Sequence, residues 1–447
     1  RDGSVAPVLC GSAISGLGVD MLMQTVLDLV PVATDMPAEA AQDDDGNAVE
    51  VAHDENGATA AIVFKTVSDQ YGKFSLVKVV RGKITGDMSL YDTTTGNTEK
   101  LGRLYTLKGK KNEEVKEICC GDIGAIGKMD KVKTGDTLSD PRKVVKLEPI
   151  PFPEPCYSVA IAPKTRGQED KVAQGLYRLN EEDPSFTLVN NAETHQMVLT
   201  AAGDIQVDVL VSKLKSRFNV ETELKTPRVP YREKIRKKVR VQGKHKKQSG
   251  GHGQYGHVKM RFEPSGDLET PYVFEQVVVG GAVPKNYFPA VEKGLQECVL
   301  KGPLAAYPVV GVKATLYDGS YHPVDSSEMA FKMATILAFK KGFMEASPVL
   351  LEPIISMKIT VPDKYTGDVM GDLNKRRGRV LGMNPDHEGN TIIEADVPLL
   401  EIYGYSTVLR SMTGGSGDFS YEFARYEQAP ADVQQKEIEA RQKVAEE

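Results

Sequence analysis

The stretch that decides the fold begins at Tyr157 and ends at Leu224. Its first six residues, YSVAIA at 157–162, have the length and the apolar composition of a β-strand. The segment QEDKVAQGLYRLNEE at 168–182 follows, and its apolar residues recur at the spacing of one helical face. That face consists of Val172, Leu176 and Leu179. Further along, the pattern predicts strands at 186–189 and 197–200, a helix at 205–218 and a strand at 220–224.

The resulting order, β-α-β-β-α-β, is the split βαβ arrangement of ferredoxin-like domains. The same order returns near the C-terminus of the chain. There the sequence predicts strands at 354–361, 379–383, 391–397 and 419–426 and helices at 367–376 and 403–412. Two ferredoxin-like domains therefore flank a central segment, and the chain is predicted to be a multidomain α+β protein.

The central segment opens with KTPRVPYREKIRKKVRVQGKHKK at 225–247. This run holds 11 Lys and Arg against a single acid, Glu233, on a chain whose net charge is -6. Local positive charge on an acidic chain is typical of a nucleic-acid surface. The run QSGGHGQYGH at 248–257 follows, and Gly-rich loops with His and Tyr suit contact with RNA. On charge alone, a solvated basic strand followed by a flexible turn fits equally well.

The central segment also predicts two helices, at 289–300 and 327–343. Ser326 or Ser327 can cap the second helix at its N-terminus. That helix carries an apolar stripe, which we expect to lie in the core. The stripe consists of Met329, Met333, Ile336 and Leu337.

The rest of the chain divides by composition. Short apolar runs between 58 and 138 predict a β-sandwich or β-barrel. Residues 5–10 resemble a strand and 19–30 an amphipathic helix, which we expect to end an α/β domain. The predicted boundaries are 1–31 for that end, 32–57 for a linker, 58–140 for the β-domain, 141–155 for a second linker, 156–224 and 351–428 for the ferredoxin-like domains, 225–350 for the central domain and 429–447 for a helical or frayed tail.

Motifs of enzyme and metal sites are missing from the sequence. It contains no Gly-Lys-Ser or Gly-Lys-Thr, the ending that a phosphate-binding P-loop requires. It also lacks a nucleophile elbow and an HExxH motif, and its five cysteines show no CxxC spacing. We therefore expect no catalytic residues, no metal ligands and no bound cofactor in this chain. The odd number of cysteines without CxxC spacing indicates reduced thiols, so we expect a cytoplasmic protein. No apolar run reaches the length of a membrane span.

Several runs of the sequence resemble elongation factor G, the translational GTPase that moves tRNA and mRNA on the ribosome. They are CGSA at 10–13, EDPSF at 182–186, QSGGHGQYGH at 248–257, GGAVPK at 280–285, YDGSYH at 317–322, VDSSEMAF at 324–331, GDLNKRRG at 371–378 and LRSMT at 409–413. The resemblance implies a C-terminal portion of that family: the end of the GTPase domain, a β-barrel domain II, ferredoxin-like domains III and V, and an elongated α+β domain IV between them.

The resemblance also implies function. Ser12 and Ala13 match the loop that contacts the guanine base, while GTP and Mg²⁺ would be bound by the intact parent. The partners would be the ribosome, through ribosomal RNA, tRNA and ribosomal proteins, with no membrane and with a monomeric chain. Two loops would form the tip of domain IV, which reaches the tRNA. They comprise Ser249, Gly250, Gly251, His252, Gly253, Gln254, Tyr255 and Gly256, and Ser320, Tyr321, His322 and Asp325.

Two basic groups are further candidates for RNA contact. They are Arg236, Lys237, Lys238 and Arg240 in the central segment, and Lys375, Arg376, Arg377 and Arg379 at a helix end. At a helix end, cations also complement the helix dipole, so a structural role is the alternative for the second group.

The sequence departs from the family at three places. The family usually has Arg where this chain has His252, Gly-Met-Gly-Glu-Leu-His where it has AAGDIQ at 201–206, and Thr-Gln-Gly-Arg-Gly where it has TGGSG at 413–417. These departures are typical of a paralogue. Translocation, ribosome recycling, ribosome protection and stand-alone RNA binding therefore remain alternative functions at this point.

Overall fold

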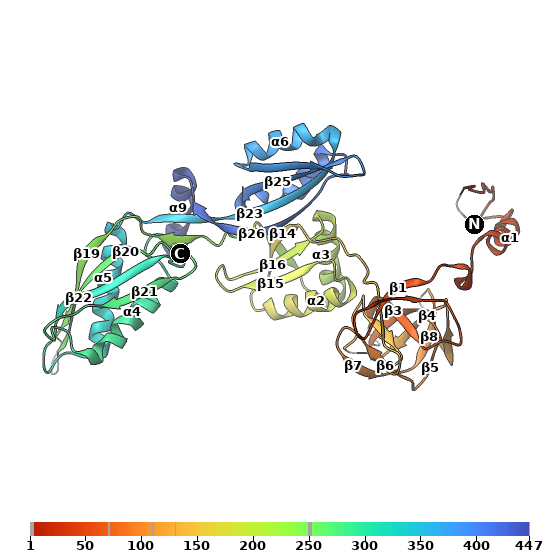
Figure 1. Ribbon diagram of the computed structural model, residues 1–447, viewed down its shortest axis with the longest axis horizontal. Coiled ribbons are helices and arrows are strands. Elements are labelled where there is room, and N and C mark those ends of the chain that lie inside the picture. The colour runs from red at the N-terminus through yellow and green to blue at the C-terminus, as the bar shows by residue number, and fades with distance from the viewer. Residues whose placement is uncertain (1–3, 70–71, 110, 130, 249–252, 447) are drawn as a thin grey trace. The chain divides into compact units, whose positions relative to one another are not determined.

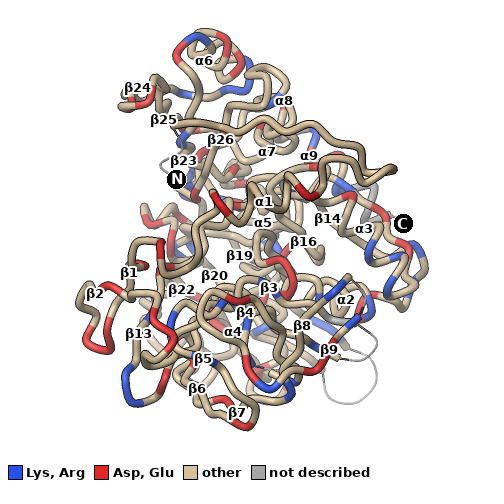
Figure 2. The backbone as a smooth tube through the Cα atoms, turned by 90° about the vertical axis from the view of Figure 1, so that its right-hand side faces the viewer, with Lys and Arg blue, Asp and Glu red and all other residues tan. Residues whose placement is uncertain are grey.

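The computed structural model describes residues 4–69, 72–109, 111–129, 131–248 and 253–446 (Figure 1). The chain forms two compact units. The first comprises Arg1–Pro155, Ala162–Leu188 and Ile205–Glu223, and the second comprises Cys156–Ile161, Val189–Asp204 and Leu224–Glu447. Positive and negative residues are interspersed along the backbone of both units (Figure 2).

The first unit begins with helix α1 (Val19–Leu29) and a short 3-10 helix, η1 (Ala33–Asp35). The strand expected at 5–10 is wrong. A strand needs a neighbour that pairs its backbone groups, and this segment is in no β-ladder with any residue that the structure describes.

The predicted linkers at 32–57 and 141–155 are also wrong in part. Strands β1 (Glu39–Asp43), β2 (Ala48–Val51) and β13 (Val145–Leu147) pair in a sheet of order β13-β1-β2. Their inward residues, including Ala41, Val51 and Leu147, form one buried cluster. The strands are short and their other face is polar, which is why composition alone indicates a loop.

The β-rich domain II expected from the sequence is confirmed. Its main sheet has eight strands in the order β7-β6-β12-β3-β4-β11-β8-β9, and β10 pairs with β5. The bounds are β3 (Ala60–Asp69), β4 (Gly72–Arg81), β5 (Lys83–Thr85), β6 (Ser89–Asp92), β7 (Asn97–Lys100), β8 (Leu104–Lys108), β9 (Lys111–Val115), β10 (Glu117–Cys119), β11 (Ile123–Gly127) and β12 (Thr137–Ser139).

The first ferredoxin-like domain has the predicted order of elements. They are β14 (Tyr157–Pro163), α2 (Glu169–Glu182), β15 (Thr187–Asn191), β16 (Gln196–Ala201), α3 (Asp204–Phe218) and β17 (Thr222–Lys225). The strand order in its sheet is β15-β16-β14-β17. Val172, Leu176 and Leu179 are buried, as the helical spacing predicted.

The second ferredoxin-like domain also has the predicted order, with one additional short helix, α7. The elements are β23 (Val349–Pro362), η3 (Asp363–Tyr365), α6 (Thr366–Lys375), β24 (Arg379–Pro385), β25 (Asn390–Pro398), α7 (Leu399–Ile402), α8 (Tyr405–Met412) and β26 (Asp418–Gln428). Strand β23 pairs with both β25 and β26. The tail beyond this domain is helical, as α9 (Ala431–Glu446).

The central domain is built on a sheet of order β19-β20-β22-β21. Two helices cover one face of this sheet (Figure 1), and buried residues from both helices and from the sheet form one core. The elements are β19 (Val239–Lys247), β20 (Gln254–Pro264), β21 (Tyr272–Gln276), η2 (Lys285–Tyr287), α4 (Phe288–Leu300), β22 (Val312–Ser320) and α5 (Glu328–Glu345). The preceding strand, β18 (Arg232–Lys234), pairs instead with Val349–Leu351 of β23.

Helix α5 buries the predicted apolar stripe only in part. Met333 and Ile336 are half-buried, and Ile336 packs against the core. The side chains of Met329 and Leu337 are 58% and 44% exposed, and the core residues are instead small or aromatic. They include Ala330, Phe331, Ala334, Ala338, Phe339 and Phe343. The reason is close packing, because a methyl group on Gly243 or Gly256 would collide with the backbone of α5. Ser327 caps α5, since its Oγ accepts a hydrogen bond from the Ala330 N–H at 3.2 Å.

Candidate nucleic-acid interface

The two predicted tip loops meet at one end of the central domain, where Asp325 joins them. Its carboxylate accepts a hydrogen bond from the Gly253 N–H at 3.0 Å, and its carbonyl accepts one from the Tyr255 N–H at 2.8 Å. The Ser326 hydroxyl donates to the Tyr255 carbonyl at 2.9 Å. The backbone of each loop is thereby held by the other. Ser249, Gly250, Gly251 and His252 lie outside the described residues.

His322 lies at the surface of the two joined loops, with 51% of its side chain exposed. Its backbone N–H donates to the Ser326 hydroxyl at 2.8 Å, which closes the turn. In the neutral form with the proton on Nε2, its Nδ1 accepts a hydrogen bond from the Asp325 N–H at 3.1 Å. The neighbouring Tyr321 side chain is 48% exposed. These two rings are available to an RNA ligand.

The side chain of Tyr255 is held in place by several neighbours. Its hydroxyl and the Nδ1 atom of His257 both lie 2.8 Å from the Ser320 hydroxyl. The ammonium of Lys244 lies 5.6 Å from the centre of the Tyr255 ring, and the His322 ring lies 6.3 Å away at a tilt of 55°. The rings of Tyr321 and His322 are therefore freer to contact a ligand than the ring of Tyr255.

The two described glycines of the first tip loop do not need the backbone freedom of glycine. Neither Gly253 nor Gly256 has a positive φ. Gly256 is buried in strand β20, where α5 leaves no room for a side chain. Its function is close packing, so it is not an exposed tip residue. Gln254, in contrast, is exposed.

The first basic group is exposed but does not form one patch. The guanidinium of Arg236 donates to the Ser347 carbonyl at 3.3 Å, and Lys238 is paired with Glu263 at 3.0 Å. Arg240 lies over the Tyr317 ring at 5.9 Å from its centre. Lys237 is exposed beside them. Sequence reasoning missed Lys244 and Lys246, although their spacing of two residues within a predicted strand could have indicated a shared face.

The second basic group is mostly engaged inside its own domain. Arg377 donates to both carboxylate oxygens of Glu352, at 2.7 and 3.0 Å, and this contact raises the pKa of Arg377. Arg376 pairs with Asp372 at 2.6 Å and Arg379 with Asp396 at 3.2 Å. These contacts favour the structural alternative for Arg376 and Arg377. Lys375 is exposed.

Ser12 and Ala13 lie in a surface turn before α1. The Ser12 N–H donates to the Leu17 carbonyl at 2.9 Å, and the Ser12 carbonyl accepts from the Gly16 N–H at 2.9 Å. Both backbone groups of Ser12 are thus used within the turn, and Ala13 is exposed.

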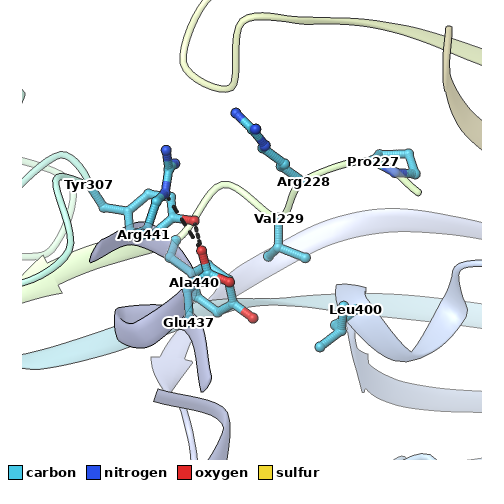
Figure 3. Close-up of a pocket in the computed structure, with 9 residues that line it drawn as sticks. Pro227, Arg228, Val229, Tyr307, Leu400, Glu437, Ala440 and Arg441 are labelled. Atoms are coloured by element: carbon cyan, nitrogen blue, oxygen red, sulfur yellow. Dashed lines mark hydrogen bonds and ion pairs between the residues drawn. The ribbon is translucent and has the colours of Figure 1, made fainter. Parts of the chain in front are cut away.

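A cavity of about 340 Å³ lies near Tyr307, Glu437 and Arg441, whose contacts are marked in Figure 3. It is lined by Pro227, Arg228, Val229, Tyr231, Tyr307, Leu400, Glu437, Ala440 and Arg441. The Arg441 guanidinium lies 4.4 Å from the centre of the Tyr307 ring and 3.6 Å from the Glu437 carboxylate. These mutual contacts indicate a joint between helix α9 and the central domain, and none of the predicted site residues lines it.

A buried acid escaped the sequence analysis. Glu233, the one acid of the basic run, is fully buried. Its carboxylate accepts hydrogen bonds from the N–H groups of Leu304, Ala305 and Tyr307 at 2.9, 2.8 and 3.0 Å. The isolated negative charge in a basic run was the available signal of a structural role.

Models of four known domains match the chain in the order in which the structure presents them. They are elongation factor G domain 2 at 58–141, domain III at 152–226, domain IV at 227–347 and the elongation factor G C-terminus at 349–437. The chain belongs to the elongation factor G family. The tip loops described above are therefore part of an elongation factor G domain IV.

A crystal structure of a protein from Thermus thermophilus is also similar. It is 37% identical, with a TM-score of 0.74, over 95% of this chain and 61% of that chain. The present chain thus spans about three fifths of that protein's length. Membership of this family relates the chain to translation elongation factors.

The described residues offer neither a metal site nor a membrane-spanning helix. No group of three or more His, Cys, Asp or Glu side chains there could hold a metal ion. No helix in the described part of the chain is both long and apolar enough to cross a membrane.

Proposed function

We propose that this chain is the ribosome-binding portion of an elongation factor G-like translational GTPase that promotes the movement of tRNA and mRNA. The observation that carries the proposal is the Asp325 clamp, whose carboxylate and carbonyl hold Gly253 and Tyr255. A preorganised tip costs less ordering entropy when it binds. It would present Tyr321 and His322 to RNA, where aromatic rings stack on unpaired bases.

The proposed setting follows from the same family relationship. The chain would act in the cytoplasm as a monomer, in contact with ribosomal RNA, tRNA and ribosomal proteins. Lys375, Arg379 and Lys237 are exposed cations that would add sequence-independent attraction to RNA phosphates.

GTP and Mg²⁺ would belong to the intact parent. The residues present here do not fit a nucleotide site, because the Ser12 turn uses its backbone groups internally and the sequence has no Gly-Lys-Ser or Gly-Lys-Thr. Phosphoryl transfer needs free backbone N–H groups and the lysine of that motif to stabilise charge on the phosphates. The purified chain should therefore give no heat of GTP binding at micromolar concentrations in calorimetry.

A paralogue that acts in recycling or protection is the second candidate. The observation that favours it is the turn after α8, where Gly414 and Gly415 have positive φ and the family's Gln and Arg are replaced. This turn lacks the cation that the family places there. Translocation assays with the intact parent separate the two functions.

Co-sedimentation with ribosomes tests the main proposal. The wild-type chain should bind 70S ribosomes and be displaced by elongation factor G. Asp325→Ala should weaken binding about tenfold, which corresponds to about 1.4 kcal/mol. Asp386→Ala is the matched control, because Asp386 also caps a turn, through Glu388 and Asn390, but lies in another domain. Equal binding to unrelated structured RNAs would instead indicate a stand-alone RNA-binding protein.

A further inference from the structure

The open face of the central sheet carries a row of cations along its edge strand. Arg240, Lys244 and Lys246 of β19 are all exposed, and the buried Val241 and Gly243 lie between the first two of them. On a strand, two residues of the same face that are two positions apart in the sequence lie about 6.8 Å apart. Among the described residues, strand β19 pairs with β20 alone and is thus an edge strand of the sheet.

Four other cations on this sheet or directly before it have acidic partners, whereas Lys237 and Lys247 are exposed and form no ion pair with a described carboxylate. Lys259 is paired with Asp318 at 2.7 Å, and Lys313 with Glu275 at 2.8 Å. Lys238 and Arg261 share Glu263, at 3.0 and 3.2 Å. Arg240, Lys244 and Lys246 form no ion pair with any carboxylate in the part of the chain that the structure describes. Their charge is therefore available to a ligand.

Two of the three lie against aromatic rings. Arg240 is 5.9 Å from the centre of the Tyr317 ring, and Lys244 is 5.6 Å from that of Tyr255. The Tyr255 ring is fixed by its hydrogen bond to Ser320. Contacts of this kind hold a cationic side chain near the sheet without neutralising its charge.

Two of these cations have a basic residue directly opposite them, while Lys246 is opposite Tyr255. Arg240 is directly opposite Arg261, and Lys244 is directly opposite His257. Like charges in directly opposite positions destabilise a sheet. Burial and the charges of Lys244 and Lys259 lower the pKa of His257, so this ring stays neutral beside them. Fold stability alone does not account for this arrangement.

Protection of an exposed edge is the simpler explanation, because lysines on edge strands prevent pairing with other chains. It accounts for Lys246 but not for basic residues that face each other on the sheet surface. We propose that the open face of β19, formed by Arg240, Lys244 and Lys246, binds the phosphate backbone of structured RNA beside the tip loops. This inference rests on the proposed function, because it takes the RNA at the tip as its ligand.

The test compares two triple variants with the same change in charge. Arg240→Gln, Lys244→Gln and Lys246→Gln remove the unpaired cations. Lys238→Gln, Lys259→Gln and Lys313→Gln remove paired ones from the same region. Thermal melting followed by circular dichroism first shows that each variant is folded. Binding is then measured as a function of salt concentration with two probes, 70S ribosomes and an isolated RNA hairpin.

Each phosphate contact contributes about 0.7 to 0.9 to the slope of log K against log salt. The first variant should reduce that slope by about 2 to 3 with both probes, and the second by less than 1. Equal slopes in the two variants would overturn the inference, as would tighter binding of polyglutamate than of the hairpin. If the hairpin shows the expected difference and ribosomes are not bound, this inference stands and the proposed function fails.

Discussion

The hydroxyl of Tyr307 donates a hydrogen bond to the carboxylate of Glu437, with the two oxygens 2.5 Å apart. Tyr307 precedes β22 in domain IV, and Glu437 belongs to helix α9. The Tyr307 ring also meets the Tyr231 ring edge-on, at 5.4 Å between centres. Burial, reinforced by Glu437, raises the pKa of Tyr307 well above its usual range, so the hydroxyl stays protonated and remains a donor.

Replacing Tyr307 by Phe should destabilise the chain by about 1 kcal/mol, because the hydrogen bond to Glu437 is lost while the ring remains. The change should appear as a lower melting temperature in circular dichroism. Tyr177→Phe is the matched control, since the Tyr177 side chain is 57% exposed. If both variants melt alike, the contact between Tyr307 and Glu437 contributes nothing to stability.

Gly256→Ala should destabilise domain IV by about 1 to 3 kcal/mol, because the added methyl group collides with α5. Gly371→Ala provides the contrast. Gly371 lies in helix α6 with no atom near the position of a Cβ, so alanine should be neutral or stabilise the helix. Chemical denaturation of both variants measures the difference. A neutral Gly256→Ala would mean that β20 and α5 are not closely packed in solution.

His322→Ala should change the free energy of unfolding by no more than about 0.5 kcal/mol, because the side chain is half exposed. In the intact parent it should slow tRNA movement while ribosome-stimulated GTP hydrolysis continues. His387→Ala, at an exposed turn of the second ferredoxin-like domain, should alter neither property. A loss of several kcal/mol in His322→Ala would show that the ring supports the fold instead.

The pKa of His257 should determine part of the pH dependence of stability. Burial, followed by the charges of Lys244 and Lys259, lowers that pKa from its usual value of about 6.5. The unfolded chain therefore binds a proton more readily than the folded chain, and stability is lost as the pH falls below about 6.5. His257→Gln should remove this part of the loss in melting curves recorded between pH 7 and 5.

Lys244→Gln gives a second measurement on the same ring. Removing the positive charge opposite His257 should raise the pKa of the imidazole, as followed by NMR titration of its C–H signals. Lys293→Gln, on helix α4, serves as the control. An unchanged titration in Lys244→Gln would show that the two side chains do not interact.

Local patterns predicted the elements of both ferredoxin-like domains, because the residues that show helical spacing, such as Val172 and Leu176, also form the buried face. The same reasoning held only in part for α5. There Gly243 and Gly256, on the paired strands β19 and β20, select small residues for the contact face, so the larger Met329 and Leu337 remain outside. Strands β1 and β13 escaped prediction because both are short and the pairing between them joins residues about a hundred positions apart in the sequence.

The candidate site was predictable to a similar degree. The resemblance to elongation factor G indicated Asp325 and His322, and the structure supplied the hydrogen bond from Gly253 that gives Asp325 its role. The arginines of 376–379 were ambiguous because their partners, Glu352 and Glu401 among them, lie elsewhere in the sequence. Pairing across such distances leaves no periodic signal in the sequence.

The pairing of β18 with the start of β23 has a mechanical consequence. Lys234 is opposite Val349, so domain IV enters and leaves through two neighbouring residues of one ladder. A force applied at the tip acts in the same direction on the end of β18 and on the start of β23. It therefore does not pull these two strands apart. The load passes onward along β23 to β25 and β26. The chain connections of domain IV therefore bear a push or a pull together at one place in this ladder.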